Sequence, residues 1–352
     1  MKKKIVITFP NIPFFSGGAE LHVAALRENL QKRGYNAEIV ELPFKWYPLQ
    51  HLYEQMLMWK LVDLSESNGE KVDLVIGTKW PSYLARHDNK IIWLIHQQRE
   101  AYDNVEMEFS QFNKEKPGHV YLQQFRDADT VAIKEAKKVF TISKNVSNRL
   151  EQYNGIASEP LYHPPKHYGH YYCEEYGDYV LSVGRLDGLK RLDLMIRAMS
   201  FTDKRVNCVI AGIGTEQEVC RLKRLVADYG LEKRVHFLGF VDDKEMLKLY
   251  AKAMCVYFAP YNEDYGYITL EAFLSKKPLV TTTDSGGVLE FAKNGESALI
   301  EDPDAYELGM AINRLYENKS LARDLGEGGY DGVKDITWDH ALDRLMMFSG
   351  LE

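Results

Sequence analysis

The chain is poor in cysteine, has no long uncharged stretch and has no excess of positive charge. Its four cysteines are scattered among 352 residues and form no C-x-x-C pair, which argues against a disulfide framework or a zinc site and fits a reducing cytoplasm. No run of about 18 residues lacks a charge, so we expect no membrane-spanning helix. The net charge of −7 argues against general binding to nucleic acid.

Several catalytic signatures are missing as well. The sequence has no G-x-S-x-G elbow, no H-E-x-x-H pair and no Walker A motif. Gly212 and Gly214 form G-x-G without a third glycine, so the dinucleotide-binding fingerprint is incomplete. No group of His and carboxylate residues has metal-ligand spacing. We therefore expect neither a resident cofactor nor a metal site.

The charge is divided unevenly along the chain. Up to His163 there are 21 Lys and Arg against 20 Asp and Glu, and beyond it there are 23 against 31. A near-neutral first part tolerates an anionic membrane better than an acidic one does. Peripheral contact with the inner face of a membrane, made by the N-terminal domain, is therefore an alternative to a purely cytoplasmic location. The basic start of the chain precedes an apolar run too short for a signal peptide, and we expect a first strand there.

Short apolar runs alternate with helical patterns along the chain. The expected strands are residues 5–8, 37–42, 72–77, 91–95 and 139–142, followed by 179–183, 208–211, 235–238, 255–258 and 279–282. The expected helices are residues 20–33 and 146–153, followed by 191–199, 216–229, 243–252, 268–274, 288–292 and 337–345. This alternation indicates βαβ units and parallel sheets that are covered on both faces.

Residues 154–177 lie between the two series and have no clear periodicity. They are rich in Tyr, His, Pro and Gly, which is typical of a linker. The fold class is therefore α/β, with two doubly wound Rossmann-like domains that face each other. A ligand is expected at the carboxyl ends of the strands, in the central cleft between the domains.

The strongest candidate motif is Glu263-Asp264-Tyr265-Gly266-Tyr267-Ile268-Thr269-Leu270-Glu271. It places one carboxylate after an expected strand and a second inside the next helix. The start of that helix presents backbone N–H groups to an anion, and both carboxylates are suited to accept hydrogen bonds from sugar hydroxyls. The alternative is that Glu263 is a surface carboxylate and Glu271 a first-turn residue stabilised by the helix dipole.

Three further motifs follow expected strands. Arg185 and Lys190 follow residues 179–183 and are suited to a diphosphate, unless they form a solvated basic turn. Gly17 and Gly18, in the segment 14–20, allow close approach of the backbone to a phosphate or sugar, although a tight turn also needs glycine. His96 follows residues 91–95 and is either a ligand contact at a strand end or a structural histidine.

Taken together and in this order, these motifs resemble the retaining glycosyltransferases of the GT-B fold, specifically glycosyltransferase family 4. The resemblance covers nearly the whole chain. It also includes residues 237–241 and 282–287, and it is strongest from Tyr179 to Glu301. Two residues depart from the family pattern, because Asp264 stands where glycine is frequent and Tyr267 where a smaller aliphatic is frequent, which leaves the donor sugar open.

The resemblance implies a role for each matched residue. Arg185 and Lys190 would bind the donor diphosphate, Glu271 the ribose, and Glu263 with Gly266 the donor sugar. The backbone amides of Tyr267, Ile268 and Thr269 would also contact the donor diphosphate. The backbone at Phe240 and Val241 would contact the base, and Gly17 and Gly18 would contact the phosphates. His96 would contact the donor sugar near the reacting carbon. It also implies domains of residues 1–163 and 164–334, with a final helix within 335–352 that crosses back. Trp338 is then either its anchor or an ordinary core residue.

The resemblance therefore implies a metal-independent transferase that moves a sugar from a nucleotide-sugar to a glycan or lipid-linked acceptor in surface polysaccharide or glycoconjugate biosynthesis. The alternatives are a sugar-nucleotide epimerase or phosphorylase of the same fold, and a non-catalytic partner subunit. The acceptor is expected on the first domain. One candidate is an apolar segment, which is either a surface that faces the acceptor or a membrane, or a helix packed in the core. Its residues are Phe44, Trp46, Tyr47, Leu52, Tyr53, Met56, Met58 and Trp59. The other candidates are Gln98, Arg99 and Tyr102, which follow His96.

Overall fold

The computed structural model describes residues 2–14, 17–107, 110–114 and 118–351. The chain divides into two compact units. The first comprises residues 1–166 and 336–352, and the second comprises residues 167–335. The bounds expected from the sequence were 1–163, 164–334 and 335–352. Each unit contains its own six-stranded sheet.

The sheet of the first unit is parallel throughout and has the strand order β2-β1-β5-β6-β7-β8. Its strands are β1 Lys4–Asn11, β2 Asn36–Pro43, β5 Leu74–Gly77, β6 Lys90–Leu94, β7 Lys138–Thr141 and β8 Glu159–Pro160. The strands β5 and β6 are buried at every residue, as expected for a parallel sheet with both faces covered. This confirms the predicted α/β fold for the unit.

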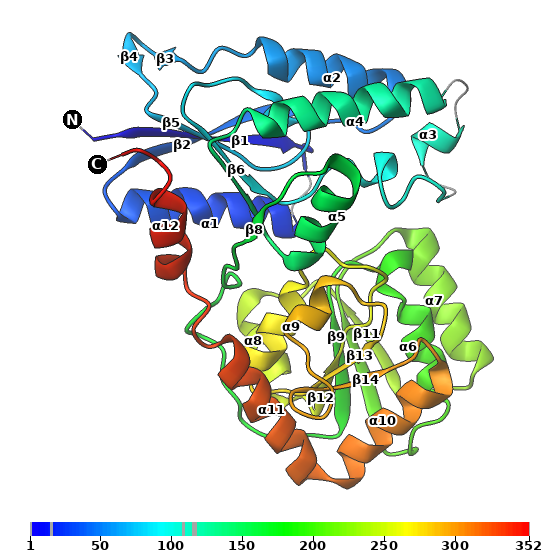
Figure 1. Cartoon of the computed structure of the whole chain (residues 1–352). Helices are drawn as coiled ribbons and strands as arrows, with labels where there is room; N and C mark the ends of the chain where they lie inside the picture. The colour runs from blue at the N-terminus through cyan, green and yellow to red at the C-terminus, as the bar shows by residue number, and fades with distance from the viewer. Residues whose placement is uncertain (1, 15–16, 108–109, 115–117, 352) are drawn as a thin grey trace. The chain divides into compact units, whose positions relative to one another are not determined.

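Helices cover both faces of this sheet. Figure 1 shows α2 and α4 on one face and α1 and α12 on the other. The helices and the small hairpin of the unit are α1 Gly18–Lys32, α2 Leu49–Leu61, β3 Glu66–Ser67, β4 Glu70–Lys71, η1 Ser82–Leu84, η2 Arg99–Ala101, α3 Gln111–Lys114, α4 Gly118–Lys134, α5 Lys144–Asn154 and α12 Trp338–Met346. Local signals define α5, since the Ser143 hydroxyl accepts from the Val146 N–H and Gly155 ends the helix with φ +60°.

The second unit repeats this architecture with the strand order β11-β10-β9-β12-β13-β14. Its strands are β9 Tyr179–Val183, β10 Asn207–Ala211, β11 Val235–Gly239, β12 Cys255–Tyr257, β13 Leu279–Thr282 and β14 Ala298–Glu301. Its helices are η3 Gly188–Lys190, α6 Leu192–Met199, α7 Glu216–Asp228, α8 Asp243–Lys252, α9 Tyr267–Leu274, η4 Gly287–Glu290, α10 Ala305–Glu317 and α11 Lys319–Val333. All of its strand pairs are parallel.

One expectation for local structure was wrong, because the helix expected at residues 288–292 is instead the short 3-10 turn η4. The boundary between the two units lies inside the segment 154–177 that was predicted as a linker. That segment also contains the short strand β8, which pairs with β7 through Thr141 and Pro160. Local hydrophobic periodicity reports neither β8 nor η4, because both depend on a neighbouring strand or turn.

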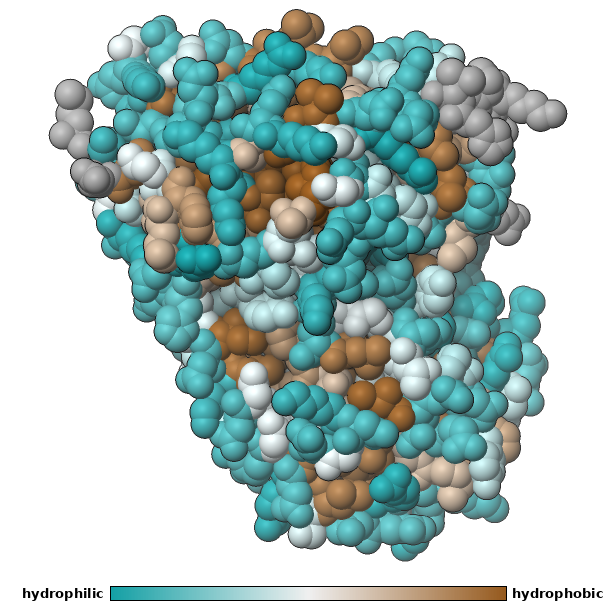
Figure 2. All heavy atoms as spheres, in the orientation of Figure 1, coloured by the Kyte–Doolittle hydropathy of each residue, from teal (hydrophilic) through white to brown (hydrophobic). Residues whose placement is uncertain are grey.

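The apolar segment after β2 is divided between core and surface. In α2, Leu52, Met56 and Trp59 are buried, as expected for a packed helix. Apolar residues also reach the surface over α2 (Figure 2), where Leu57 is 61% and Leu61 82% exposed. Among the described residues, no helix has the length and hydropathy required to span a membrane.

The last helix, α12, packs against α1 and β6 of the first unit. The guanidinium of Arg33, the residue that follows α1, donates to the carboxylates of Asp339 and Asp343. Trp338 lies in a buried cluster with His22, whose ring centroid is 5.9 Å away, and with Trp93 and His163. The rings of His22 and His163 are 4.1 Å apart. This aromatic cluster attaches the final helix to the first unit.

We expect the aromatic cluster to make stability depend on pH. Burial lowers the pKa of His22 to about 3 and lowers that of His163 below its ordinary value. The unfolded chain therefore binds protons that the folded chain does not, and stability is lost as the pH falls below about 6.5. His22 alone should cost about 2 kcal/mol between pH 8 and pH 5.

Urea unfolding of the wild type and of His22→Phe at both pH values measures this loss. The variant should lose about 2 kcal/mol less than the wild type on acidification. The exposed His170, replaced by Gln as a control, should leave the pH dependence unchanged. An equal loss in the wild type and in His22→Phe would contradict the assignment.

Candidate functional site

The candidate residues of the second unit follow two neighbouring strands, β9 and β12. From β9 the chain continues to β10 and β11 on one side, whereas β12 is followed by β13 and β14 on the other side. This is the point at which the strand order reverses, and open α/β sheets bind ligands beside the carboxyl ends of such strands. Lys190 follows β9 and Glu263 follows β12, so the topology brings both motifs to one edge of the sheet.

The turn after β9 packs backbone against backbone. Gly184 has φ +120° and its N–H donates to the carbonyl of Ala211 (3.0 Å). A Cβ at Gly212 would lie 1.7 Å from the Gly184 carbonyl oxygen. No other residue fits at Gly212, and this close packing fixes the segment that presents Arg185. The Arg185 Nε donates to Asp187 Oδ2 (2.9 Å), and the arginine side chain is more than half exposed.

Lys190 and Glu263 form an ion pair between the two loops. Both side chains are about one quarter exposed, and the Lys190 Nζ lies 5.1 Å from the centroid of the Phe258 ring. The structure therefore brings together these two predicted residues. A half-buried ion pair of this kind is a charge pair that an incoming anion or hydroxyl can rearrange.

Gly266 begins α9 in a left-handed conformation, with φ +83° and ψ +62°. A Cβ there would lie 3.0 Å from Val288 Cγ2 and 3.2 Å from Phe258 Cε1, so the position favours glycine both sterically and conformationally. The N–H of Thr269 donates to the Gly266 carbonyl (2.9 Å). The amides of Tyr267 and Ile268 precede it in the first turn, where the helix dipole favours an anion.

Glu271 lies inside α9 and is held by a tyrosine. The Tyr250 hydroxyl donates to Glu271 Oε2 (2.6 Å), and the ring of Tyr171 contacts that of Tyr250 edge-on, with centroids 6.2 Å apart. Burial raises the pKa of Glu271 more than the hydroxyls of Tyr250 and Tyr171 lower it, so the net direction is upward. The structure thus gives the carboxylate that was predicted to bind a ribose a hydrogen-bond donor from α8.

Phe240 and Val241 follow β11 at the edge of the same sheet. Gly239 precedes them with φ +68°, and its carbonyl accepts from the Gly212 N–H (2.8 Å). The Phe240 side chain is 79% exposed. The segment predicted to contact a base therefore projects into solvent from the loop that packs on the Gly212 turn.

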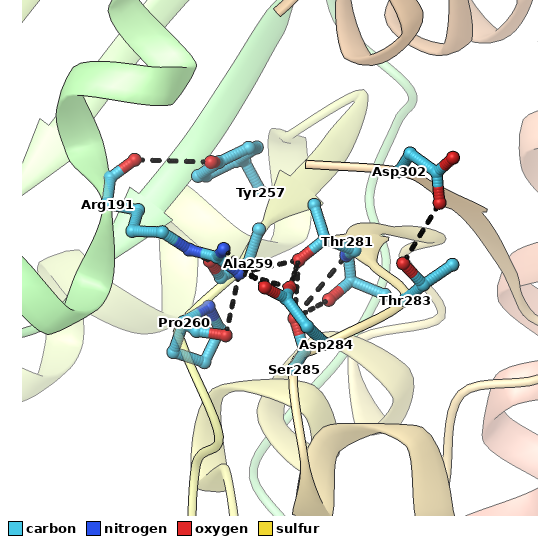
Figure 3. A network of polar contacts seen from close by, with 10 residues as sticks. Arg191, Tyr257, Ala259, Pro260, Thr281, Thr283, Asp284, Ser285 and Asp302 are labelled. Carbon is cyan, nitrogen blue, oxygen red and sulfur yellow. Dashed lines mark hydrogen bonds and ion pairs between the residues drawn. The ribbon is translucent and has the colours of Figure 1, made fainter. Parts of the chain in front are cut away.

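Arg191, to which the sequence analysis assigned no role, organises this edge of the sheet. Its guanidinium donates to both Asp284 carboxylate oxygens (2.7 and 2.8 Å), to the carbonyls of Ala259 and Pro260 and to Thr282 Oγ1 (Figure 3). Arg191 thereby ties the loops after β9, β12 and β13 to one another. Burial raises the pKa of Asp284, but hydrogen bonds from Arg191 and Thr282 outweigh it, and the pKa is lowered overall.

The same loops are joined beside Glu263. The Glu263 N–H donates to the carbonyl of Ser285 (3.2 Å), and the Glu263 carbonyl accepts from the Gly287 N–H (2.7 Å). A Cβ at Gly286 would lie 2.7 Å from the Glu263 carbonyl oxygen. The backbone of Glu263 is therefore fixed by the segment 282–287, which the sequence showed only as part of a resemblance.

The remaining predicted residues belong to the first unit. Gly17 caps α1, and its N–H donates to Glu20 Oε2 (2.8 Å), while Gly18 is the first residue of the helix. Residues 15 and 16 of this motif lie outside the described residues. His96 follows β6, and its Nδ1 lies 2.6 Å from the Gln97 carbonyl oxygen.

Of the three residues after His96 that were considered for the acceptor, two have side-chain partners and the third is buried. Tyr102 is fully buried, and its hydroxyl donates to Asp129 Oδ2 (2.8 Å). Arg99 pairs with Asp103 (2.5 Å), and Gln98 is buried. The expectation that Tyr102 presents its side chain to an acceptor was wrong, because the side chain points into the core. Within the described residues, no group of three or more His, Cys, Asp or Glu is arranged to hold a metal ion.

We expect Arg191→Ala to lower the free energy of unfolding by about 2–4 kcal/mol, because it removes the paired cation from Asp284 and the donor from the carbonyls of Ala259 and Pro260. Urea denaturation measures the change. Arg185→Ala is the matched control, since that side chain is exposed and should change stability by less than about 0.5 kcal/mol. Equal effects of the two substitutions would show that Arg191 does not organise the loops.

Comparisons with known proteins agree with this architecture. Residues 174–332 match the family described as Glycosyl transferases group 1. The human alpha-1,3/1,6-mannosyltransferase ALG2 is 29% identical over 171 residues, which are 44% of this chain and 41% of the relative. The chain thus aligns with less than half the length of that relative.

Two solved structures show the same fold. Sucrose-phosphate synthase of Thermosynechococcus elongatus has a TM-score of 0.81 at 18% identity and covers 99% of both chains. HepE of Anabaena, solved in complex with UDP-glucose, has a TM-score of 0.70 at 17% identity, over 98% of this chain and 100% of its own. The chain therefore has the GT-B fold, and its residues 174–332 are similar to the family described as Glycosyl transferases group 1.

Proposed function

We propose that this chain is a retaining glycosyltransferase that moves a sugar from a nucleotide-sugar donor to a glycan or lipid-linked acceptor. The observation that supports it most is the edge of the second sheet, where Lys190 and Glu263 pair beside the N-terminus of α9 and Glu271 lies one turn further on. A cation and a helix N-terminus are suited to bind a diphosphate, and two carboxylates are suited to accept hydrogen bonds from the hydroxyls of the two sugar rings joined to it.

The donor diphosphate would lie between Lys190, Arg185 and the amides of Tyr267 and Ile268. The bond between the anomeric carbon and the phosphate oxygen breaks, so negative charge develops on the leaving nucleoside diphosphate. Fixed positive charge at that position stabilises the transition state more than the ground state. Arg185 and Lys190 supply this charge, which is why we propose that no metal ion is needed.

Glu263 would change partners when the donor binds. In the structure its carboxylate pairs with Lys190, and phosphate would attract the Lys190 ammonium away from it. The freed carboxylate then accepts hydrogen bonds from hydroxyls of the donor sugar, with Gly266 allowing the backbone to approach. Glu271 would accept from the ribose, and the loop at Phe240 and Val241 would contact the base.

The first unit would supply the remaining contacts. Gly17 and Gly18 are assigned to the phosphates and His96 to the donor sugar near the reacting carbon. The acceptor hydroxyl attacks on the face from which the diphosphate departs, and its proton passes to the leaving phosphate oxygen. The anomeric configuration is then retained, and atoms and charge balance without a further reactant.

A cellular setting follows from the same proposal. The exposed residues Trp46, Tyr47, Leu57 and Leu61 around α2 support contact with an acceptor or with a membrane surface, where aromatic side chains favour the interface. We propose a cytoplasmic enzyme of surface polysaccharide or glycoconjugate biosynthesis with peripheral membrane contact through the first unit.

We expect Lys190→Ala to weaken donor binding without unfolding the chain. UDP-, GDP- and ADP-sugars are screened by thermal shift, and the one that binds should stabilise the wild type by about 2.7 kcal/mol at a 100-fold excess over Kd. Lys190→Ala should weaken its binding at least tenfold and lower transfer by roughly 100-fold or more. Lys276→Ala, which removes another lysine that pairs with a glutamate, Glu327, is the matched control and should behave as the wild type.

The other outcomes separate the alternatives. Isomerisation of the donor without an acceptor would indicate an epimerase, and a requirement for inorganic phosphate would indicate a phosphorylase. Donor binding without transfer to any acceptor would support a partner subunit. Failure of every nucleotide-sugar to bind the wild type would contradict the assignment of the site.

A further inference from the structure

We propose that a cavity at the carboxyl ends of β1 and β2 binds one neutral sugar ring of a glycan acceptor, at a distance from the ring that receives the transferred sugar. The inference rests on the proposed function, because it takes His96 as the mark of the reacting carbon. It narrows the acceptor to a chain of at least two sugar units, and it assigns the surface around Trp46 to that chain rather than to a membrane.

The cavity lies within the first unit, between three segments of the chain. Ile12 and Pro13, which follow β1, form one wall, the loop after β2 forms a second, and the first turns of α2 form a third. Its volume is about 540 Å³, which lies within the range of roughly 300–1,000 Å³ that is usual for small-molecule sites. The cavity is therefore large enough for a sugar ring.

The loop after β2 is held in place by hydrogen bonds on both sides. The Phe44 N–H donates to the Asn11 carbonyl (2.7 Å), which joins the ends of β2 and β1. From α2, the Gln55 side chain accepts from the Lys45 N–H (3.3 Å) and donates to the Lys45 carbonyl (2.5 Å). The wall is thus formed before a ligand arrives, which reduces the entropy lost on binding.

This loop presents two aromatic rings at the cavity. Trp46 is 41% and Tyr47 is 48% exposed, and their ring centroids lie 5.2 Å apart at an interplanar angle of 75°. The face of an aromatic ring is negative and attracts groups of partial positive charge. The C–H groups on the face of a sugar ring have this polarity, because each carbon is bonded to oxygen.

A carboxylate and an imidazole form the polar side of the cavity. Glu54 Oε2 lies 2.5 Å from His51 Nδ1, and Glu54 Oε1 accepts from the Gln50 side chain (2.7 Å). The hydrogen bonds from His51 and Gln50 hold the pKa of Glu54 below its ordinary value. Because an ionised carboxylate only accepts, His51 Nδ1 carries the proton, and Nε2 of the neutral imidazole is an acceptor. Both residues therefore match ligand hydroxyls, which donate.

The charge of the cavity favours a neutral ligand. The Lys45 Nζ lies 4.8 Å from the centroid of the Tyr47 ring, so one ammonium balances the one carboxylate of Glu54. A phosphorylated ligand would have no excess of positive charge to pair with. An acyl chain would remove water from Lys45, His51 and Glu54 without replacing the lost hydrogen bonds, which costs free energy. A neutral polyhydroxylated ring satisfies both the aromatic and the polar wall.

The strand order separates this cavity from the reacting carbon. The order β2-β1-β5-β6 places two strand spacings between β1 and β6, and three between β2 and β6. Neighbouring strands are about 4.8 Å apart, so the cavity lies roughly 10–14 Å from His96, which follows β6. One ring does not reach both positions. The ring in the cavity is therefore a distal unit of the acceptor.

Binding is tested without a donor. Saturation-transfer NMR measures Kd for neutral di- and trisaccharides of glucose, galactose, mannose and N-acetylglucosamine. We expect at least one of them to bind the wild type, and Trp46→Ala to weaken its binding at least tenfold, because a large exposed ring is lost from the wall. Glu54→Gln should weaken it at least threefold, because a charge-assisted hydrogen bond becomes a neutral one.

Two matched controls lie outside the cavity. Tyr229→Ala removes an aromatic side chain of similar exposure, 44%, from the second unit. Glu28→Gln removes an exposed helical carboxylate of the first unit that pairs with Lys32. Both controls should bind the oligosaccharide within twofold of the wild type. Thermal melting of all four variants shows that each is folded at the temperature of the measurement.

Transfer distinguishes a distal contact from a merely structural role. With the nucleotide-sugar that binds the wild type as donor, Trp46→Ala should raise KM for the oligosaccharide at least tenfold and change kcat by much less. The contact is remote from the reacting carbon, so it stabilises the bound acceptor and the transition state equally. A loss of kcat equal to the loss of kcat/KM would contradict the distal assignment.

Three binding results would overturn the inference alone. One is that no oligosaccharide of the panel binds the wild type, and another is that Trp46→Ala binds it as the wild type does. The third is that vesicles of phosphatidylcholine and phosphatidylglycerol, and not the oligosaccharides, bind the wild type and release Trp46→Ala, which would assign the surface to a membrane. Failure of every nucleotide-sugar to bind would instead overturn the proposed function, and with it the role of the bound glycan as an acceptor.

Discussion

The Arg191 guanidinium is the interaction on which the edge of the second sheet depends. Parallel strands end side by side, but the loops that leave them diverge and have no ladder to hold them. Arg191 donates to the loop after β12 and to Asp284 and Thr282 after β13, while its own backbone lies between η3 and α6. A planar group with five donors can join three loops at once, which the point charge of a lysine cannot. The positions of Lys190 and Glu263 follow from this junction.

Charge at this edge is paired in advance of any ligand. Lys190 is paired with Glu263 and Arg185 with Asp187, whereas Glu271 accepts a hydrogen bond from the Tyr250 hydroxyl. Partly buried charges without partners would cost free energy in the empty site. An arriving diphosphate can replace Glu263 as the partner of Lys190 and release a carboxylate for hydroxyl groups, so that one exchange prepares two contacts.

The first unit is organised around a different constraint, which is the burial of neutral histidines among aromatic rings. His22, Trp93, His163 and Trp338 come from α1, β6, the segment after β8 and α12. The chain leaves this unit after Lys166 and returns to it at Ile336. His163 and Trp338 lie close to these two points, so the cluster holds the outgoing and the returning segments together. A hydrophobic contact of this type stabilises packing only while the imidazoles remain uncharged.

The sequence by itself determined the α/β class, the alternation of strands and helices and the residues of the motifs after β9 and β12, because hydrophobic periodicity and glycine positions are local properties. It did not determine β8 or η4, nor that Tyr102 points into the core, since these depend on partners distant in the chain. Lys190 and Glu263 were both expected at a site, but their pairing is a contact across 73 residues. Arg191 and Asp284, and Tyr250 and Glu271, likewise became neighbours only through the tertiary structure. The sequence therefore determined which residues are candidates for the site. The tertiary structure decided which of them share hydrogen bonds, because the strand order sets which loops meet.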